Sequence, residues 1–321
     1  MSDNIRWGIL GAANFARQFM GPAIHQARGG GLTAIATSNP QKAQAFSAFA
    51  PGLEVYDGYD ALLADDEIDA IYIPLPNHLH LEWSEKAIEA GKHVLCEKPM
   101  TLKAEEFDHL IKLRDKSGLL VAEAYMILHH PQWHYAKSLY DSGAIGELAL
   151  VDSVFTYSND DRENIRNRPE TAGGGIRDIG VYNYGSARYV TGEEPDSISY
   201  ADIVLENDID VYAHVVASFP SFRFSAVNGM RLAVRQSVNF HGSLGVISVT
   251  APFNAGVFGE AQVELHKPNL EVSVRRFPGV NQYVLQVENF NESIKTGAEY
   301  PCPLEFSRGT QKMIDMVFAT L

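Results

Sequence analysis

Short apolar strands alternate with amphipathic helices along the first 125 residues of the chain. The strand-like stretches are continuously apolar and alternate with stretches in which apolar residues recur at helical spacing. The strands fall at 6–11, 32–37, 69–76, 93–99 and 119–125, with a smaller one at 53–57. Strands of this kind are typical of a parallel sheet that helices cover on both faces. The pattern therefore predicts a doubly wound α/β domain over residues 1–124.

The remaining residues follow a different rhythm, with many strands and few helices. Strand patterns occur at 147–158, 197–205, 210–219, 222–228, 233–242, 245–251, 261–265 and 271–276. One helical pattern, 176–192, is embedded among them, and two more, 281–297 and 306–320, end the chain. Such a run predicts an α+β domain over residues 125–321 with a large, open, mainly antiparallel sheet.

Charge and cysteine content exclude several classes of protein. The formal net charge of -14 argues against binding to nucleic acid or to an acidic membrane surface. The two cysteines, Cys96 and Cys302, are too few for a disulfide framework and fit a reducing compartment. The chain carries no signal-peptide pattern and no run of eighteen apolar residues. We expect a cytoplasmic protein that acts on a small molecule.

A glycine turn after the first strand indicates a nucleotide site. The stretch GILGAANFA is a variant of the dinucleotide fingerprint of the Rossmann fold, in which small residues let the backbone approach a pyrophosphate. A small-residue turn can also serve tight packing alone, but this one stands at the start of the first βαβ unit, as the fingerprint requires. The residues predicted to contact the cofactor here are Gly11, Ala12, Ala13, Asn14 and Phe15.

The residues after the second strand favour NADP over NAD. An NAD site usually presents an acid there to the ribose 2′-hydroxyl, and this chain has none. Thr37, Ser38 and Asn39 offer hydroxyl and amide groups, and Lys42 follows one helical turn later. Together they suit a 2′-phosphate. The alternative interpretation is a capped, solvated helix start, and NAD remains possible.

The stretch HVLCEKP ends a buried strand on a carboxylate and an amine. Ligands of open α/β sheets bind beyond the carboxyl ends of the strands, and Gly11, Ser38, Pro74 and Lys98 each fall at such an end. Adjacent side chains of an extended chain face opposite ways, so Glu97 and Lys98 are not expected to pair with each other. We predict that this edge forms part of a cleft wall.

Five stretches together resemble the Gfo/Idh/MocA oxidoreductases: RWGILGAANFA, PLPNHLH, GKHVLCEKPM, EAYMILHHPQ and TAGGGIRDIGVYNYGSARYVTGEEP. The order D-I-G-x-Y, with Tyr182 where many members have His, resembles the branch of glucose-fructose oxidoreductase, dimeric dihydrodiol dehydrogenase and NADP-dependent D-xylose dehydrogenase. The resemblance implies a Rossmann domain followed by an α+β domain whose open sheet commonly mediates dimers. A homodimer or higher homo-oligomer is therefore expected.

The resemblance also implies roles for individual residues. Lys98 would contact nicotinamide and substrate, with a cis bond to Pro99, and Tyr182 would be the acid/base. The other cofactor-side residues would be Leu75, Pro76, Asn77, His80 and Glu97. Two departures are notable: Ala13 stands where many members have glycine, and Arg177 precedes Asp178 where the branch usually has Leu or Met. Arg177 either recognises an acidic substrate group or bends outward to solvent.

Hydride transfer from a carbinol requires a group that takes the hydroxyl proton. A tyrosine with its ordinary pKa of about 10 is too weak a base near neutrality, and a neighbouring ammonium such as that of Lys98 lowers that pKa. Asp178 precedes Tyr182 by four residues and shares its helix face, and the glycines 173–175 would let this helix start approach the cleft. Candidate substrate contacts are Tyr125, His130, Tyr157, Arg166 and Arg177.

The sequence thus predicts an NADP(H)-preferring oxidoreductase of sugars or polyols, with an aldose such as D-xylose or D-glucose favoured. No metal is expected, because His129, His130 and His134 have no acidic or cysteine partner at ligand spacing. Two alternatives on the same residues are a trans-dihydrodiol dehydrogenase and a dicarbonyl-sugar reductase. A non-catalytic NAD(P)-binding sensor and a glycosidase that uses NAD transiently are further alternatives.

Overall fold

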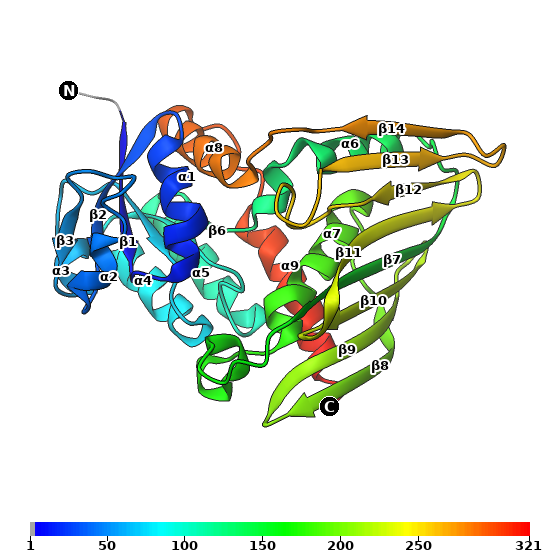
Figure 1. Ribbon diagram of the computed structural model, residues 1–321, viewed down its shortest axis with the longest axis horizontal. Helices are drawn as coiled ribbons and strands as arrows, with labels where there is room; N and C mark the ends of the chain where they lie inside the picture. Colours follow the sequence, from blue (N-terminus) through cyan, green and yellow to red (C-terminus); the bar gives the residue numbers. More distant parts are fainter. Residues whose placement is uncertain (1–3) are drawn as a thin grey trace. The chain divides into compact units, whose positions relative to one another are not determined.

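The computed structural model describes residues 4–321, which divide into two compact units (Figure 1). The first unit comprises the chain up to His129 together with Gln282–Arg308, and the second comprises His130–Asn281 and Gly309–Leu321. The sequence analysis placed the domain boundary at residues 124 and 125 and assigned everything after it to the second domain. The units of the structure differ from that division in residues 125–129 and in segment 282–308, both of which belong to the first unit.

The first unit is built on a six-stranded parallel sheet, as predicted. Its strand order is β3-β2-β1-β4-β5-β6, with β1 Ile5–Leu10, β2 Gly30–Ala36, β3 Glu54–Tyr56, β4 Ala70–Ile73, β5 His93–Cys96 and β6 Val121–Glu123. The order reverses at β1, so the switch point lies between β1 and β4. The helices of this unit are α1 Gly21–Gln26, α2 Pro40–Gln44, α3 Tyr59–Leu63, α4 His80–Glu89, α5 Ala104–Ser117 and α8 Gln282–Thr296.

The first helix contains a π-helical turn, Ala16–Met20, which the sequence pattern did not indicate. Pro22 lies two residues after this turn and has no backbone N–H to donate to the carbonyl four residues earlier. Gly21 N donates instead to Ala16 O, one residue further back. The wider turn therefore accommodates the proline, and the regular helix α1 continues from Gly21.

Helix α8 joins the first unit through a buried asparagine. Asn291 Oδ1 accepts from Trp7 Nε1 at 2.9 Å, and Asn291 Nδ2 donates to Arg28 O at 2.9 Å. The rings of Trp7 and Phe290 lie 5.1 Å apart. On the same helix, Glu288 pairs with the Arg28 guanidinium at 2.9 Å. These contacts link a segment near residue 290 to strand β1 and to the loop before strand β2. The local sequence gives no signal of this long-range pairing.

The second unit contains an eight-stranded sheet of order β14-β13-β12-β11-β7-β10-β9-β8. Its strands are β7 Leu148–Ser158, β8 Ser197–Glu206, β9 Ile209–Ser218, β10 Arg223–Gly229, β11 Arg231–Gly242, β12 Gly245–Val249, β13 Gln262–His266 and β14 Val272–Arg276. All neighbouring pairs are antiparallel except β7 with β10, so the predicted fold class is confirmed. Helices α6 Pro131–Asp141, α7 Val181–Thr191 and the last part of α9 Leu304–Phe318 belong to this unit.

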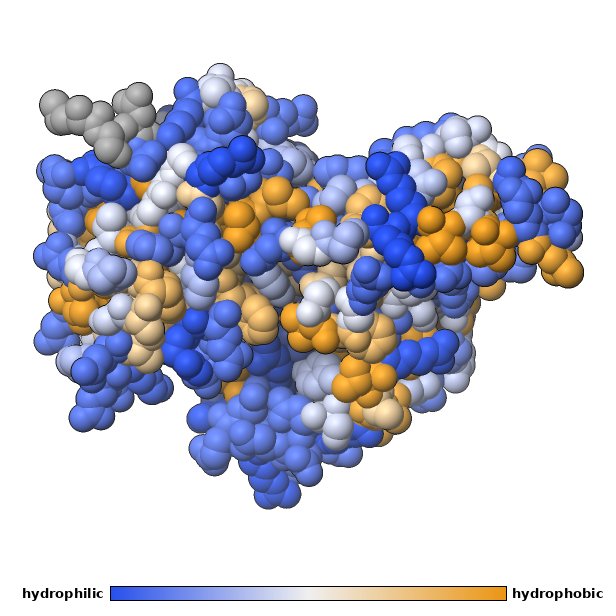
Figure 2. All heavy atoms as spheres, turned by 45° about the horizontal axis from the view of Figure 1, so that its top comes forward, coloured by the Kyte–Doolittle hydropathy of each residue, from blue (hydrophilic) through white to orange (hydrophobic). Residues whose placement is uncertain are grey.

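One face of the eight-stranded sheet is buried and the other is largely open. Alternate residues of β9 are buried, among them Val211, Ala213, Val215 and Ala217. Apolar side chains exposed elsewhere in the sheet and its hairpins are Tyr200, Val204, Leu232, Val234, Leu244, Leu270, Val272 and Val274. Figure 2 shows hydrophobic side chains in orange at the right-hand end, where the hairpins between β11 and β12 and between β13 and β14 lie. Among residues 4–321, no helix is both long and apolar enough to cross a bilayer.

The buried asparagine gives a stability prediction. Asn291→Leu leaves the Trp7 indole N–H and the Arg28 carbonyl without their partner, which should lower the free energy of unfolding by about 1–3 kcal/mol. The measurement is urea unfolding followed by tryptophan fluorescence. Glu292→Leu, at the neighbouring exposed position, is the control. Equal stabilities for the two variants would contradict the role assigned to Asn291.

Candidate functional site

The glycine turn after β1 has the geometry of a nucleotide-binding loop. Gly11 has φ +94°, and a Cβ at this position would lie 3.0 Å from Leu75 Cδ2, so a side chain would be both strained and crowded. Gly11 N donates to Ala36 O at 2.8 Å, which ties the turn to the end of β2. The remaining turn residues are half-buried or exposed: Ala12, Ala13, Asn14 and Phe15. The turn therefore leaves backbone accessible at the carboxyl edge of the sheet.

The segment after β2 combines helix capping with exposed polar groups. Asn39 Oδ1 accepts from the backbone N–H groups of Gln41 and Lys42 at 3.1 and 3.3 Å, and Thr37 Oγ1 accepts from Asn39 N at 3.2 Å. The capping interpretation thus holds for Asn39. The Ser38 hydroxyl and the Lys42 ammonium remain at exposed positions, so they fit a 2′-phosphate.

His80 lies between two backbone segments of the same edge. Its Nδ1 is 2.8 Å from Pro99 O and its Nε2 is 2.7 Å from Leu75 O, so a protonated nitrogen at either position donates to that carbonyl. The Lys98–Pro99 bond is cis, which the family resemblance implied. Burial lowers the pKa of His80 to about 4, although both carbonyls oppose the shift. The other two predicted residues of this loop, Pro76 and Asn77, are half-buried.

Glu97 is bonded to two neighbours at the end of β5. Its Oε1 accepts from the Tyr72 hydroxyl at 2.6 Å, and its Oε2 accepts from Lys98 N at 3.3 Å. Burial, together with the Glu97 carboxylate, raises the pKa of Tyr72 well above its usual range, so this phenol stays protonated and donates. The half-buried Lys98 side chain thus extends from a backbone that these contacts hold.

Glu123 is a further member of this group that the sequence analysis missed. Its carboxylate accepts from Met100 N at 2.8 Å, two residues beyond Lys98, and it is almost fully buried. Burial raises its pKa, whereas the bonds from Met100 and Ser307 oppose the shift. The signal was present as a single carboxylate inside the apolar strand pattern 119–125. Its partner could not be read, because the two segments meet only in the folded sheet.

Three aromatic rings pack together beside the glycine turn. The Phe15 and Phe19 ring centroids are 5.2 Å apart, and the Tyr283 ring lies 5.7 Å from Phe15 and 5.5 Å from Phe19. Tyr283 belongs to α8, so the long-range docking of that helix also completes the surroundings of a predicted cofactor residue. Nothing in the local sequence around Phe15 indicates this neighbour.

In the second unit, Asp178 joins two of the predicted substrate residues. Its Oδ2 accepts from the Tyr157 hydroxyl at 2.7 Å and lies 3.0 Å from Arg166 Nε. The carboxylate raises the pKa of Arg166, and burial with the carboxylate raises the pKa of Tyr157. Asp178 therefore lies between a cation and a phenol, in a π-helical turn that leads directly into α7.

Tyr182 follows one turn after Asp178, and its ring is fixed by aromatic packing. Its ring centroid lies 5.8 Å from that of Phe155 and 5.7 Å from that of Phe253, and these two phenylalanines stack on each other at 5.0 Å. The loop that carries Phe253 is itself held in place, because Trp133 Nε1 donates to Pro252 O at 2.9 Å. The orientation of Tyr182 is therefore set by side chains from three separate segments.

The remaining three predicted substrate residues contact neighbours within their own units. Tyr125 is fully buried in the first unit, 5.9 Å from the Phe306 ring. His130 is fully buried in the second unit, where its Nδ1 accepts from Gln132 N at 3.1 Å. The Arg177 guanidinium lies 4.5 Å from the centre of the Phe318 ring. Arg177 thus packs on an aromatic ring and does not bend outward to solvent.

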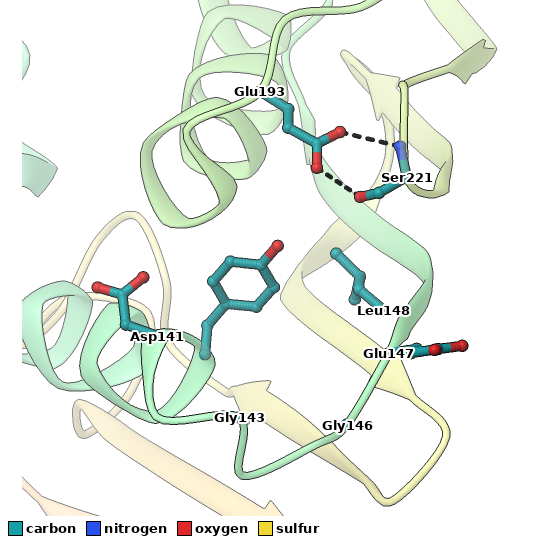
Figure 3. A pocket seen from close by; sticks show the side chains of 8 residues that line it. Asp141, Gly143, Gly146, Glu147, Leu148, Glu193 and Ser221 are labelled. Carbon is teal, nitrogen blue, oxygen red and sulfur yellow. Dashed lines mark hydrogen bonds between the residues drawn. The ribbon is translucent and has the colours of Figure 1, made fainter.

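A pocket of the second unit lies apart from these residues (Figure 3). Its volume is about 610 Å³, and it is lined by Tyr140, Asp141, Gly143, Gly146, Glu147, Leu148, Glu193 and Ser221. The Glu193 carboxylate accepts from both the backbone N–H and the hydroxyl of Ser221, as the dashed lines of Figure 3 mark. None of the predicted site residues is among its lining, and residues 4–321 hold no cluster of three metal-ligating side chains.

The burial of His80 predicts a pH-dependent stability. Because its pKa falls from 6.5 to about 4 on folding, the unfolded chain binds the proton more readily. The corresponding stability is complete above pH 6.5 and is lost as the pH falls toward 4, by at most about 1.4 kcal/mol per pH unit. Urea unfolding across this range should show a smaller loss for His80→Gln than for the wild type, with His78→Gln at an exposed position as control. Identical pH dependence in all three proteins would rule the assignment out.

Comparison with known proteins places the two units in one family. A family model described as "Oxidoreductase family, NAD-binding Rossmann fold" matches residues 5–125, and one described as "GFO/IDH/MocA C-terminal domain" matches residues 133–248. The chain is 32% identical to a dTDP-3,4-didehydro-2,6-dideoxy-alpha-D-glucose 3-reductase of Streptomyces violaceoruber, over 92% of this chain and 86% of the relative. It is 31% identical to a D-xylose 1-dehydrogenase (NADP(+)) of Haloferax volcanii, over 97% and 96%.

A solved structure agrees with this placement. KijD10, a 3-ketoreductase from Actinomadura kijaniata solved with NADP and TDP-benzene, has a TM-score of 0.90 and 29% sequence identity, over 98% of this chain and 97% of that one. The match covers both units, and the relatives span nearly the whole length of the chain. The chain therefore belongs to the Gfo/Idh/MocA family and is an NAD(P)-dependent oxidoreductase that acts on CH–OH groups.

Proposed function

We propose that this protein is an NADP-preferring oxidoreductase that interconverts a hydroxyl and a carbonyl group of a sugar, with Lys98 and Tyr182 as the acid–base pair. The observation that carries the proposal is the Asp178 carboxylate. It accepts from Tyr157, pairs with Arg166 and stands one turn before Tyr182. This arrangement offers both donors and acceptors to the hydroxyl groups of a polyhydroxylated substrate.

The first unit supports NADP as the redox partner. The Gly11 turn has no room for a side chain, and the exposed Ser38 hydroxyl and Lys42 ammonium suit a 2′-phosphate. NADP is also the cofactor in the solved relative KijD10. When bound, the nicotinamide would supply hydride to the substrate or accept it. The residues at the sheet edge would bind and orient that ring and exclude water from it.

The proton steps would belong to residues of the chain. In reduction, the Tyr182 hydroxyl would donate a proton to the substrate oxygen, and in oxidation its phenolate would accept one. The Lys98 ammonium would favour the phenolate and hydrogen-bond the reacting oxygen. The packing of Phe155 and Phe253 around Tyr182 supports this role, because a fixed ring presents its hydroxyl in one direction. Asp178 would orient the substrate through its remaining acceptor positions.

We favour a free aldose such as D-xylose or D-glucose as the substrate. The Arg166 guanidinium is engaged by the Asp178 carboxylate, which makes it less suited to bind a phosphate. The Haloferax relative supports this choice by its name. A second candidate is reduction of a keto group on a dTDP-linked sugar, which the Streptomyces relative and the TDP-benzene complex of KijD10 favour.

A homodimer through the second unit belongs to the same proposal. The open face of the eight-stranded sheet exposes apolar side chains, including Tyr200 and Val204. Exposed apolar surface of this kind is often an interaction site. Burying it against a second copy would leave the covered face of the sheet, which carries the helices, unchanged.

The acid–base assignment predicts the effect of a single oxygen. Tyr182→Phe keeps the ring and its packing but removes the hydroxyl, so kcat should fall by about a hundredfold to ten-thousandfold. The measurement is absorbance of the reduced nicotinamide, with NADP and a panel of aldoses, polyols, dihydrodiols and dTDP-sugars. Tyr189→Phe, on the same helix, should retain activity. Unchanged turnover in Tyr182→Phe would remove this residue from the mechanism, and tight cofactor binding with no turnover on any compound would favour the sensor.

The cofactor assignment predicts a selective loss. Lys42→Ala removes the ammonium proposed to bind the 2′-phosphate, so the Kd for NADP should rise about tenfold while the Kd for NAD stays unchanged. Fluorescence titration with both nucleotides measures this difference. Lys116→Ala, on α5, is the matched control for loss of a surface charge. Equal weakening for NAD and NADP would contradict a phosphate contact by Lys42.

A further inference from the structure

Asp210 is a buried carboxylate that lies against the first turn of the helix carrying Asp178 and Tyr182. It stands near the start of β9 and is only 4% exposed. Its Oδ2 accepts from Ile176 N at 2.5 Å, and the carboxylate also accepts from Gly175 N. The first N–H groups of a helix have no partner within the helix, so a carboxylate at this position satisfies them. It also carries the charge that the N-terminus of a helix favours.

The three glycines before this helix make room for that carboxylate. A Cβ on Gly174 would lie 2.0 Å from Asp210 Oδ1, and its φ of +111° disfavours any other residue. A Cβ on Gly173 would lie 2.5 Å from Arg166 O. Gly174 N also donates to Arg166 O at 3.0 Å. Within the second unit these glycines therefore pack against Asp210 and the Arg166 backbone.

We propose that Asp210 is a positioning residue for the acid–base helix, acting through the backbone of Gly175 and Ile176. The inference rests on the proposed function of Asp178 and Tyr182. Because Asp178 lies two residues after Ile176, the bond to Asp210 sets the direction in which the Asp178 carboxylate leaves the turn. The same glycine segment holds the backbone of Arg166, which pairs with Asp178. Asp210 thus anchors both partners of that ion pair without touching the substrate.

The surroundings of Asp210 make its charge sensitive to pH. Burial raises its pKa to about 7, and this rise is opposed by the backbone N–H bonds and by Arg177 on the same helical turn. Tyr184 of α7 also faces it, and Asp315 of α9 lies near Arg177. The negative charge at the helix start should therefore be present above about pH 7 and lost below it.

The test is Asp210→Asn in the full-length protein with NADP and an active sugar. The neutral amide resembles the protonated acid. Above pH 7, kcat of the variant should therefore be about tenfold lower than kcat of the wild type, and below pH 7 the two values should converge. The Kd for NADP should change little. Asp202→Asn, at an exposed position on the neighbouring strand β8, is the matched control. A wild-type to variant ratio of kcat that is constant with pH, or an unchanged kcat, would overturn the proposal.

A second measurement requires neither activity nor a folded variant. Hydrogen exchange in the wild-type protein should show greater protection of the Gly175 and Ile176 amides above pH 7 than below it, after correction for the intrinsic exchange rate. Protection that does not change with pH would overturn the proposal whether or not a substrate is found. If exchange behaves as expected but no sugar reacts, the positioning of the helix start stands and the proposed reaction fails.

Discussion

A buried polar side chain is stable only when it has hydrogen-bond partners. Three buried polar side chains of this protein bond to the backbone of segments that carry candidate site residues. His80 faces the carbonyls of Leu75 and Pro99, and Glu123 accepts from Met100 N, which lies on the far side of the Lys98–Pro99 bond. In the second unit, Asp210 plays the same part for the turn before Asp178. Loss of any of these hydrogen bonds would lower the stability of the fold, so each bond restricts the position of the neighbouring backbone.

This arrangement separates the groups that would react from the groups that hold them. In the first unit, the backbone N–H of Lys98 donates to Glu97, and in the second, aromatic packing fixes the ring of Tyr182. Such support matters in catalysis because displacements of about 1 Å can reduce rates strongly. Family membership defines the chemistry as NAD(P)-dependent oxidation and reduction at CH–OH groups.

Local patterns of the sequence were sufficient to predict the fold. They did not predict the pairings between distant segments. Continuous apolar strands and helical spacing predicted both sheets, because burial on one or two faces leaves a periodic trace. The docking of α8 through Asn291 and the partners of Glu123 and Asp210 left no such trace, since each bond joins residues far apart in the chain. Arg177 shows the same limit: its position beside Phe318 depends on where α9 packs.

The proposed reaction is transfer of hydride between NADP and a carbon atom of a sugar. The most direct test is to supply NADPH deuterated at the transferable position of the nicotinamide, together with lactones and keto-sugars, and to analyse the products by mass spectrometry. The account predicts one deuterium at the newly formed carbinol carbon. Products without deuterium, or binding of NADPH with no consumption of it, would contradict the claim.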